Sequence, residues 1–274
     1  MACSYLSMLK VVYLHIGVPR TGSTSIQRAL FKSAEALRSY GADYPSIGLQ
    51  KGAHVNLTLE MGRPHAKLRF DEAMGTWADI RKHAERSAYR KFIVSCEAFA
   101  SFNDEQVADV SRRLSGVETK IVFFVRNQVN AIQSAYRHML IRREVTPDHA
   151  INKMVTMRHY DYRLLYDRWA SHFGGFAMRP IIYERCQSGA LKDLLAVVDK
   201  RIDASRFPIL TENLSKNSTP PFALEQVHQI HEAFDQSNRQ FEEIVGRLPR
   251  SYFRDEPPHW AEAISRPWTR FLAR

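Results

Sequence analysis

Near its N-terminus the chain carries a short apolar strand followed at once by a glycine-containing loop and an amphipathic helix, a pattern that few folds share. The segment Lys10-Val-Val-Tyr-Leu-His-Ile16 is apolar and rich in β-branched residues, which is typical of a buried strand. Apolar residues then recur at helical spacing from Ile26 to Leu37, and Gly41 ends the pattern. Strand, loop and helix in this order open a βαβ unit.

Apolar strands and amphipathic helices alternate along the rest of the chain. The expected strands are 10–16, 90–97, 120–126 and 176–183, and the expected helices are 23–37, 104–114, 129–139, 162–173, 191–198 and 222–248. This alternation predicts an α/β protein with a parallel central sheet flanked by helices. We expect one domain over residues 1–274, in which the irregular segment at about 42–91 lines the substrate cleft. The tail at 250–274 has no assigned role.

The charge of the chain indicates an anionic partner. It carries 39 Lys and Arg residues against 29 Asp and Glu residues, a formal net charge of +10. A surplus of this size favours a nucleotide, an acidic glycan or a membrane surface. The basic residues are scattered rather than gathered with aromatic residues on one element, so we do not expect nucleic acid as a partner.

Cysteine content and hydropathy indicate the compartment. Cys3, Cys96 and Cys186 are widely spaced and odd in number, which predicts neither a disulfide framework nor a zinc site. Lys10 interrupts the apolar residues near the N-terminus, so we expect no signal peptide. No apolar run approaches the ~18 residues of a membrane-spanning helix. We therefore expect a cytoplasmic protein, with peripheral membrane contact left open.

The loop after the first strand predicts an anion-binding site. Gly17-Val-Pro-Arg-Thr-Gly-Ser-Thr24 has the Gly-x4-Gly spacing of a phosphate loop, and it lies between a strand and a helix as that motif requires. Backbone N–H groups and the helix dipole favour an anion at this point. Arg20 adds a full positive charge. The hydroxyl donors of this segment are Thr21, Ser23, Thr24 and Ser25.

One departure from the phosphate-loop pattern bears on its use. A nucleoside-triphosphate loop ends in Gly-Lys-Ser/Thr, whereas Ser23 stands here in place of the lysine and the basic residue is Arg20. A kinase or NTPase also needs a Mg²⁺-holding Asp after a strand, which the sequence does not offer cleanly. This alternative is weakened but stays open, as does a non-catalytic anion-binding module.

A second motif follows the most apolar strand. Val122-Phe-Phe-Val-Arg126 places an arginine at a strand end, and Ser134 comes eight residues later on the next expected helix. The forked guanidinium of an arginine can grip a phosphate, and a serine about two turns on can donate to the same group. An arginine paired with a carboxylate at the sheet edge is the structural alternative.

The two motifs together resemble those of the sulfotransferases that use 3′-phosphoadenosine 5′-phosphosulfate, in particular bacterial and carbohydrate-type members. The segment Pro19-Arg-Thr-Gly-Ser-Thr-Ser25 resembles the loop that binds the 5′-phosphosulfate. The Arg126 and Ser134 pair resembles the site of the 3′-phosphate, and Asn213-Leu-Ser-Lys-Asn217 resembles the loop that covers the nucleotide. The resemblance covers roughly residues 10–224.

The resemblance implies a fold, a donor and an acceptor class. The fold would be the sulfotransferase variant of the P-loop nucleoside-triphosphate-hydrolase-like fold, with 3′-phosphoadenosine 5′-phosphosulfate as donor, adenosine 3′,5′-bisphosphate as product and no metal. The acceptor would offer a hydroxyl or an amine on a carbohydrate or glycolipid, and the positive net charge favours an anionic one. The expected nucleotide-binding residues are Arg20, Thr21, Gly22, Ser23, Thr24, Ser25, Arg126, Ser134, Asn213, Ser215 and Lys216.

The chemistry needs charge stabilisation and a general base. Sulfuryl transfer has a loose, in-line transition state like that of phosphoryl transfer, so Arg20 is expected to stabilise the bridging oxygen of the donor. Glu97, at the end of the second expected strand, is the first candidate for the base. Glu35 is the second, since some bacterial members carry their base on the helix after the loop. His54 is the third. A helix cap or an ion pair with Arg126 is the structural alternative for Glu97.

Overall fold

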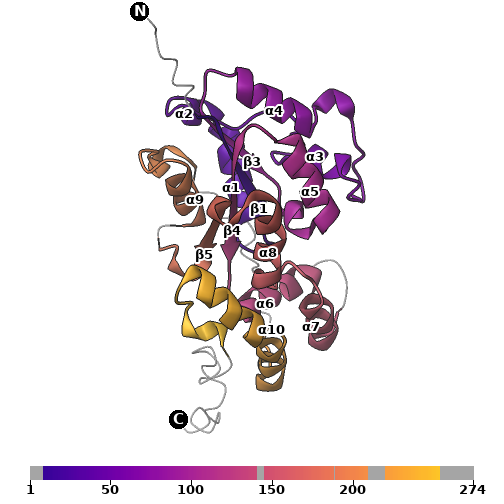
Figure 1. The fold of residues 1–274 in the computed structure, drawn as a ribbon. Helices are drawn as coiled ribbons and strands as arrows, with labels where there is room; N and C mark the ends of the chain where they lie inside the picture. The colour runs from indigo at the N-terminus through magenta and orange to yellow at the C-terminus, as the bar shows by residue number, and fades with distance from the viewer. Residues whose placement is uncertain (1–8, 141–144, 188, 209–219, 254–274) are drawn as a thin grey trace, which may run out of the picture. The chain divides into compact units, whose positions relative to one another are not determined.

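The computed structural model describes residues 9–140, 145–187, 189–208 and 220–253 (Figure 1). The chain divides into two compact units, residues 1–125 with 164–214 and residues 126–163 with 215–274, and each is described below by itself. The expectation of one domain over the whole chain stays a prediction. Most of the tail at 250–274 lies outside the described residues.

A five-stranded parallel sheet forms the centre of the first unit (Figure 1). Its strands are β1 (Val11–Gly17), β2 (Ala42–Asp43), β3 (Lys91–Ser95), β4 (Glu118–Val125) and β5 (Met178–Ile182). The order across the sheet is β2-β3-β1-β4-β5. The predicted α/β class is therefore confirmed, and β2 is a strand that the sequence pattern missed because it has only two residues.

The strand order fixes where a ligand can bind. The chain runs from β1 to β2 and back to β3 on one side of β1, and then crosses to β4 on the other side. A change of direction of this kind opens a crevice at the carboxyl ends of the strands, which is where parallel α/β sheets bind ligands. The Gly17–Gly22 loop leaves β1 at this end, and Glu97 follows β3 there.

The prediction of one continuous helix over 23–37 is wrong. The segment forms α1 (Ser23–Lys32) and α2 (Ala34–Arg38), separated by Ser33 with φ −118° and ψ 28°. The Ser33 N–H donates to the carbonyls of both Ala29 and Leu30, a bifurcated bond typical of a helix end. The break lets residues from both short helices enter one core.

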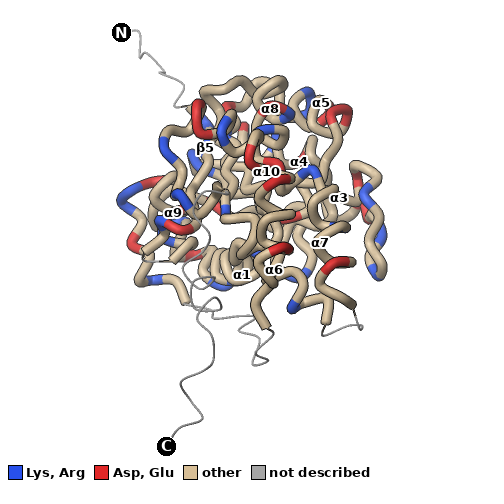
Figure 2. Tube along the Cα trace, turned by 90° about the horizontal axis from the view of Figure 1, so that it is seen from below, with Lys and Arg blue, Asp and Glu red and all other residues tan. Residues whose placement is uncertain are grey.

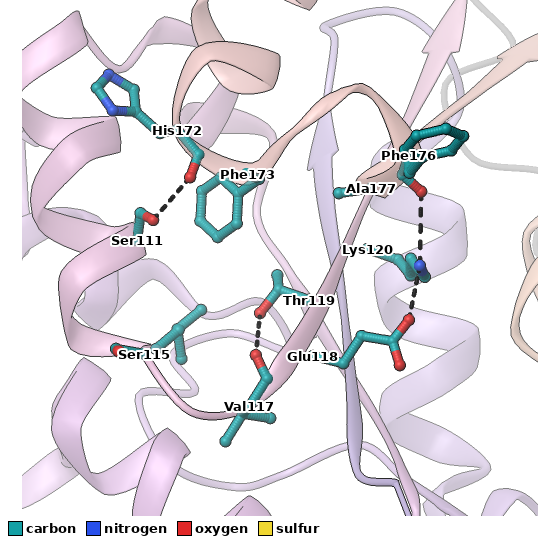
Figure 3. Close-up of a pocket in the computed structure, with 11 residues that line it drawn as sticks. Ser111, Ser115, Val117, Glu118, Thr119, Lys120, His172, Phe173, Phe176 and Ala177 are labelled. Atoms are coloured by element: carbon teal, nitrogen blue, oxygen red, sulfur yellow. Dashed lines mark hydrogen bonds and ion pairs between the residues drawn. The ribbon is translucent and has the colours of Figure 1, made fainter.

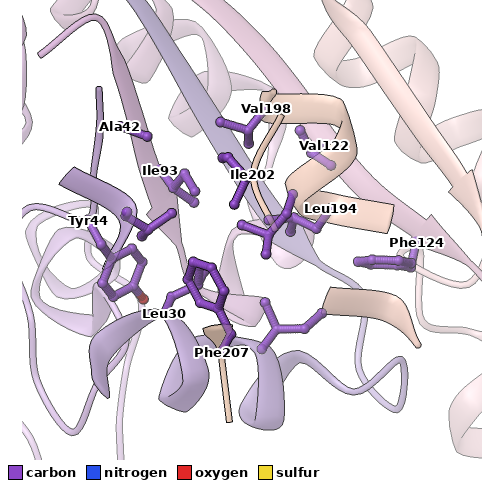
Figure 4. Packing of buried hydrophobic residues seen from close by; sticks show 13 residues of the cluster. Leu30, Ala42, Tyr44, Ile93, Val122, Phe124, Leu194, Val198, Ile202 and Phe207 are labelled. Carbon is purple, nitrogen blue, oxygen red and sulfur yellow. The ribbon is translucent and has the colours of Figure 1, made fainter. Parts of the chain in front are cut away.

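That core lies between the sheet and its covering helices (Figure 4). It combines β-branched and aromatic side chains of the strands with leucines and valines of α1, α2 and α9 (Ala190–Val198). Its members include Ile26, Leu30, Leu37, Ala42, Tyr44, Ile93, Val122, Phe124, Leu194, Leu195, Val198, Ile202 and Phe207. Burial of this apolar surface anchors α1, and with it the loop before α1, to the sheet.

The expected cleft segment at 42–91 contains more helix than its irregular pattern indicates. It holds α3 (Val55–Glu60), the 3-10 helix η1 (Glu72–Met74) and the ten-residue helix α4 (Trp77–Arg86). A capping box of Thr76 and Asp79 starts α4, and this Thr-x-x-Asp signal is present in the sequence.

A second group of buried aromatic side chains packs in the first unit. Trp77 of α4, Phe99 of η2 (Glu97–Ser101) and Phe102 form successive ring contacts, and Phe102 stacks on Trp169 with ring centroids 6.4 Å apart. Trp169 belongs to α8 (Tyr162–Phe173), and α5 (Asp104–Arg113) is capped by Asn103. The remaining short elements of this unit are η3 (Gly175–Ala177), η4 (Tyr183–Arg185) and η5 (Ala204–Arg206).

The second unit is helical. It contains α6 (Gln128–Leu140), α7 (Pro147–Val155), α10 (Leu224–Val245) and the 3-10 helix η6 (Arg250–Tyr252). The expected helices over 129–139 and 222–248 correspond to α6 and α10, whereas α7 was not expected. A buried amide pair joins α6 to α10, because Gln128 Nε2 donates to Asn238 Oδ1 at 2.8 Å. None of the helices within the described ranges combines the length and apolar character needed to cross a membrane.

Candidate anion-binding site

The Gly17–Gly22 loop has an unusual backbone for its residue types. Two of its non-glycine residues have positive φ, Val18 at 124° and Arg20 at 72°. Such angles are rare for residues with a side chain, and for a β-branched residue they are a clear outlier. Strain of this kind collects at functional sites, where the surrounding structure holds it in place. The buried Val18 side chain shows that the loop is held by the core beneath it.

The hydroxyl groups of the loop divide into two kinds. The Thr21 hydroxyl donates to the Val18 carbonyl at 2.7 Å, and both Thr21 and Ser23 are buried and lie 3.4 Å apart at their hydroxyl oxygens. These two side chains therefore build the loop. Thr24 and Ser25 are half-buried, and their hydroxyls make no hydrogen bond to another residue of the described ranges. They are the hydroxyls that suit a ligand best.

The N-terminus of α1 adds donors to the loop. Gly22 is its N-cap with φ 82° and ψ 12°, and no side chain of the described residues caps this end. The first N–H groups of a helix have no partner inside the helix, and the dipole places partial positive charge on them. Arg20 brings a full charge to the same loop. The arrangement fits an anion such as the phosphosulfate end of a nucleotide.

Gly17 lies directly against Glu97. A Cβ atom built on Gly17 would lie 2.4 Å from Glu97 Cα and 2.8 Å from Glu97 Cβ, and Gly17 has φ +77°. No residue with a side chain fits this position without a shift of the backbone. The anion loop and the Glu97 backbone therefore meet at the carboxyl ends of β1 and β3. This contact is the central geometric fact of the site.

The surroundings of Glu97 change its acidity in two opposite ways. Desolvation of its carboxyl group by the atoms around it raises its pKa above the ordinary value, while the positive charge of Arg20 lowers it. The residue as a whole is nevertheless exposed to solvent. A raised pKa makes a carboxylate a stronger base, which suits the role expected for Glu97.

The other two candidates for the base lie in different surroundings. His54 is fully buried, and its Nδ1 accepts a hydrogen bond from the Ser95 N–H at 3.0 Å while its Nε2 lies 3.0 Å from the Pro45 carbonyl. Burial lowers its pKa to about 4. These bonds favour a structural role for His54. Glu35 is exposed on the first turn of α2. Both stay predictions, and the geometry favours Glu97.

Arg126 and Ser134 belong to the second unit, where Arg126 comes just before α6 and Ser134 lies within it. The backbone of Arg126 is held by Tyr162, whose hydroxyl donates to the Arg126 carbonyl at 2.5 Å and lies 3.2 Å from the Arg126 N–H. Asn127 caps α6, because its Oδ1 accepts from the Asn130 N–H at 3.0 Å. Ser134 is half-buried one to two turns into the helix. Their phosphate-binding role stays a prediction.

Three of the expected nucleotide-binding residues, Asn213, Ser215 and Lys216, lie outside the described residues. Within the described ranges, no three His, Cys, Asp or Glu side chains are grouped as metal ligands. The expectation that the chemistry needs no metal stays a prediction.

A pocket of about 370 Å³ lies elsewhere in the first unit (Figure 3). It is lined by residues around the amino end of β4, among them Glu118, Lys120 and Phe173. The anion loop leaves the opposite, carboxyl end of the parallel sheet. This pocket is therefore separate from the candidate site, and no sequence motif predicts it.

Several residues of the site carry no recognisable motif. His15, Gln27 and Ser95 form a buried hydrogen-bonded group beneath the loop, and Tyr162 holds Arg126. The only available signal was a polar residue in an otherwise apolar strand, as His15 and Ser95 are in β1 and β3. That signal indicates a buried polar contact but not its partner.

The parallel α/β fold of this chain is shared with a solved sulfotransferase structure. A similar solved structure is that of a sulfotransferase from Alicyclobacillus acidocaldarius, with a TM-score of 0.51 and 15% sequence identity over 88% of this chain and 97% of that chain. At this identity the likeness shows the fold alone. No protein-family model matches the chain, and no curated protein matches it.

Proposed function

We propose that this protein is a sulfotransferase that moves a sulfuryl group from 3′-phosphoadenosine 5′-phosphosulfate to a hydroxyl or amine of a carbohydrate or glycolipid acceptor. The observation that carries the proposal is the contact of Gly17 with Glu97, because it joins an anion-binding loop and a carboxylate at one edge of the sheet. The sulfotransferase fold of the similar solved structure supports the same class of reaction.

The residues of the loop fit a nucleotide that ends in a phosphosulfate. The N–H groups at the start of α1 and the hydroxyls of Thr24 and Ser25 would bind its oxygens, and Arg20 would offset the charge that develops on the bridging oxygen. The donor supplies the sulfuryl group. Ser23 in place of a lysine is buried inside the loop, which argues against the kinase alternative.

Glu97 would take the proton of the acceptor. As the acceptor oxygen or nitrogen forms its bond to sulfur and the bond from sulfur to the bridging oxygen breaks, the acceptor loses one proton to the carboxylate. Desolvation of the Glu97 carboxyl raises its pKa and so its basicity, while the positive charge of Arg20 acts in the opposite direction. Arg126 and Ser134 would bind the 3′-phosphate of the donor.

The distribution of charge favours an enzyme over a non-catalytic anion-binding module. Figure 2 shows Lys and Arg at many separate points of the described trace, with Asp and Glu between them. A module that binds polyanions by charge would gather its basic residues on one element. The surplus of +10 is compatible with an anionic glycan as acceptor.

The first test is ligand-induced stabilisation by adenosine 3′,5′-bisphosphate, with ATP and Mg²⁺ as the comparison. A ligand at ~100 times its Kd should stabilise the folded protein by about 2.7 kcal/mol. We expect a rise in Tm with the bisphosphate that is lost in Arg20→Ala and Arg126→Ala. The matched control is Arg112→Ala, an exposed arginine on α5 that pairs with Asp109. A rise with ATP alone would contradict the proposal.

The second test is transfer itself. The full chain is incubated with radiolabelled donor and a panel of neutral oligosaccharides, acidic oligosaccharides, glycolipids, phenols and amines. We expect label on a carbohydrate-containing acceptor, and loss of at least about 100-fold in kcat in Glu97→Gln with little change in bisphosphate affinity. Label that moves equally well in Glu97→Gln would remove Glu97 from the role of base.

A further inference from the structure

Ser95, the last residue of β3, is held at every one of its polar groups by residues from other elements. Its N–H donates to His54 Nδ1 at 3.0 Å, and its carbonyl accepts from the His54 N–H at 2.9 Å. Its hydroxyl oxygen lies 2.7 Å from His15 Nδ1 and accepts from Gln27 Nε2 at 3.2 Å. All four residues are buried.

His54 replaces a missing strand at this point. β2 pairs with β3 only at Lys91 and Phe92, so the backbone of Ser95 extends beyond the end of its neighbour. The His54 backbone and ring take over the hydrogen bonds that a longer β2 would make. Since Nδ1 accepts from Ser95, the proton of the neutral ring is on Nε2, where it donates to the Pro45 carbonyl.

The hydroxyl of Ser95 joins three elements. His15 lies directly opposite Ser95 in the β1–β3 register, and Gln27 is on the second turn of α1. Donation from the Ser95 hydroxyl to His15 Nδ1 leaves one unsatisfied donor, the Nε2–H of His15, which has no partner within the described residues. If His15 Nδ1–H donated to the Ser95 hydroxyl oxygen instead, both His15 Nε2 and the Ser95 hydroxyl proton would lack a partner. Donation from Ser95 to His15 is therefore favoured.

The place of this group in the chain gives it a consequence for the site. His15 is two residues before Gly17, Ser95 is two residues before Glu97, and Gln27 lies on the helix that begins at the anion loop. Gly17 in turn touches the Glu97 backbone. We propose that Ser95, gripped by His15 and Gln27, is the positioning residue that fixes Glu97 relative to the anion loop. This inference rests on the proposed function only for its kinetic readout.

The chemistry of the group supports a positioning role over mere packing. A buried polar network with one unsatisfied nitrogen costs stability relative to apolar side chains of the same shape. Hydrogen bonds, unlike apolar contacts, fix direction and distance, which a site with a charged loop and a base requires. A longer apolar side chain could not replace the Ser95 hydroxyl, because it could form a hydrogen bond with neither His15 nor Gln27.

The test compares Ser95→Ala with Ser111→Ala. Ser111 is half-buried in the same unit and donates to the His172 carbonyl at 3.0 Å, so its loss removes a similar bond far from the loop. We expect kcat to fall about 10- to 100-fold in Ser95→Ala and about 2-fold at most in Ser111→Ala. The Kd for adenosine 3′,5′-bisphosphate should stay within about 2-fold in both. Gln27→Met, which keeps the shape and loses the donor, should show the same pattern more weakly.

A double-mutant cycle separates positioning from general destabilisation. If Ser95 acts through Glu97, Ser95→Ala should have no further effect on kcat in a Glu97→Gln background. An equal loss of kcat in both backgrounds, or no loss beyond that of Ser111→Ala, overturns the proposal.

A readout without activity keeps the inference distinct from the proposed function. The carboxyl carbon of Glu97, identified by its absence in Glu97→Gln, is titrated by NMR in the wild type, Ser95→Ala and Ser111→Ala. We expect the titration midpoint of Glu97 to move in Ser95→Ala alone, because the carboxyl group changes its distance from Arg20. An unchanged midpoint overturns the positioning role, even if the wild type proves inactive as a sulfotransferase.

Discussion

Replacement of Gly17 by alanine is the sharpest test of how the site is built. The new Cβ would lie 2.4 Å from Glu97 Cα, an atom of the backbone that cannot swing aside as a flexible side chain would. The positive φ of +77° adds strain for any residue with a side chain. Left-handed backbone costs about 1–2 kcal/mol, and overpacking of a tight site costs about 1–3 kcal/mol. We expect Gly17→Ala to lose about 2–5 kcal/mol of unfolding free energy.

The assay is thermal and urea unfolding beside a matched glycine. Gly116 has a similar φ of +89°, yet a Cβ built on it meets no atom within 4 Å. Gly116→Ala therefore carries the backbone strain without the clash and should cost only about 1–2 kcal/mol. At about 2–4 °C of Tm per kcal/mol, the expected fall is roughly 4–20 °C for Gly17→Ala and roughly 2–8 °C for Gly116→Ala.

The two glycine variants should also differ in their affinity for ligand. Relief of the clash must move either the loop or Glu97, so Gly17→Ala should weaken binding of adenosine 3′,5′-bisphosphate, whereas Gly116→Ala should leave it unchanged. Equal losses of stability in the two variants, with equal ligand affinity, would refute the close packing of the loop on Glu97.

Three further predictions follow from single contacts. Tyr162→Phe removes the hydroxyl that holds the Arg126 backbone, so it should cost about 1–2 kcal/mol in urea unfolding and weaken bisphosphate binding measured by calorimetry. His54 is buried as the neutral ring with a pKa lowered to about 4, so protonation of the unfolded chain should lower Tm as the pH falls from about 6.5 toward 4. His54→Gln should flatten that decline, and an unchanged slope would contradict the assignment. The raised pKa of Glu97 favours its protonated form in the folded state, so ionisation of Glu97 costs stability above its folded-state pKa. Glu97→Gln should therefore raise Tm near pH 7, and the gain should vanish in acid below the pKa of an unfolded glutamate.

The periodicity of apolar residues predicts most of the strands of the first unit. Four of its five strands were expected within two residues or so of their observed ends, because each is a short apolar run bounded by polar residues or glycine. The exceptions have physical reasons. β2 is too short to show any pattern, and the break at Ser33 serves a core that draws residues from two directions. α7 begins at a Thr-Pro pair, which is a local signal of a helix start rather than a periodic one.

The candidate site, like the fold, is predictable from the sequence only in part. A strand, a glycine loop and a helix are a local pattern, so the sequence alone is enough to predict an anion site at Arg20 to Ser25. The division of their hydroxyls into those that build the loop and those that face a ligand could not, because it depends on how Thr21 folds back on Val18. His54 was a plausible base in sequence, and only its burial against Ser95 and Pro45 shows its structural surroundings.

Local propensity and the order of elements along the chain are enough to predict the class of fold, a candidate anion loop and a carboxylate after a neighbouring strand. The contact of Gly17 with Glu97 and the hydrogen bonds that join His15, Gln27 and Ser95 appear only in the folded chain. Those contacts join residues 68 to 80 positions apart. They depend on strand order and register, which no local pattern encodes.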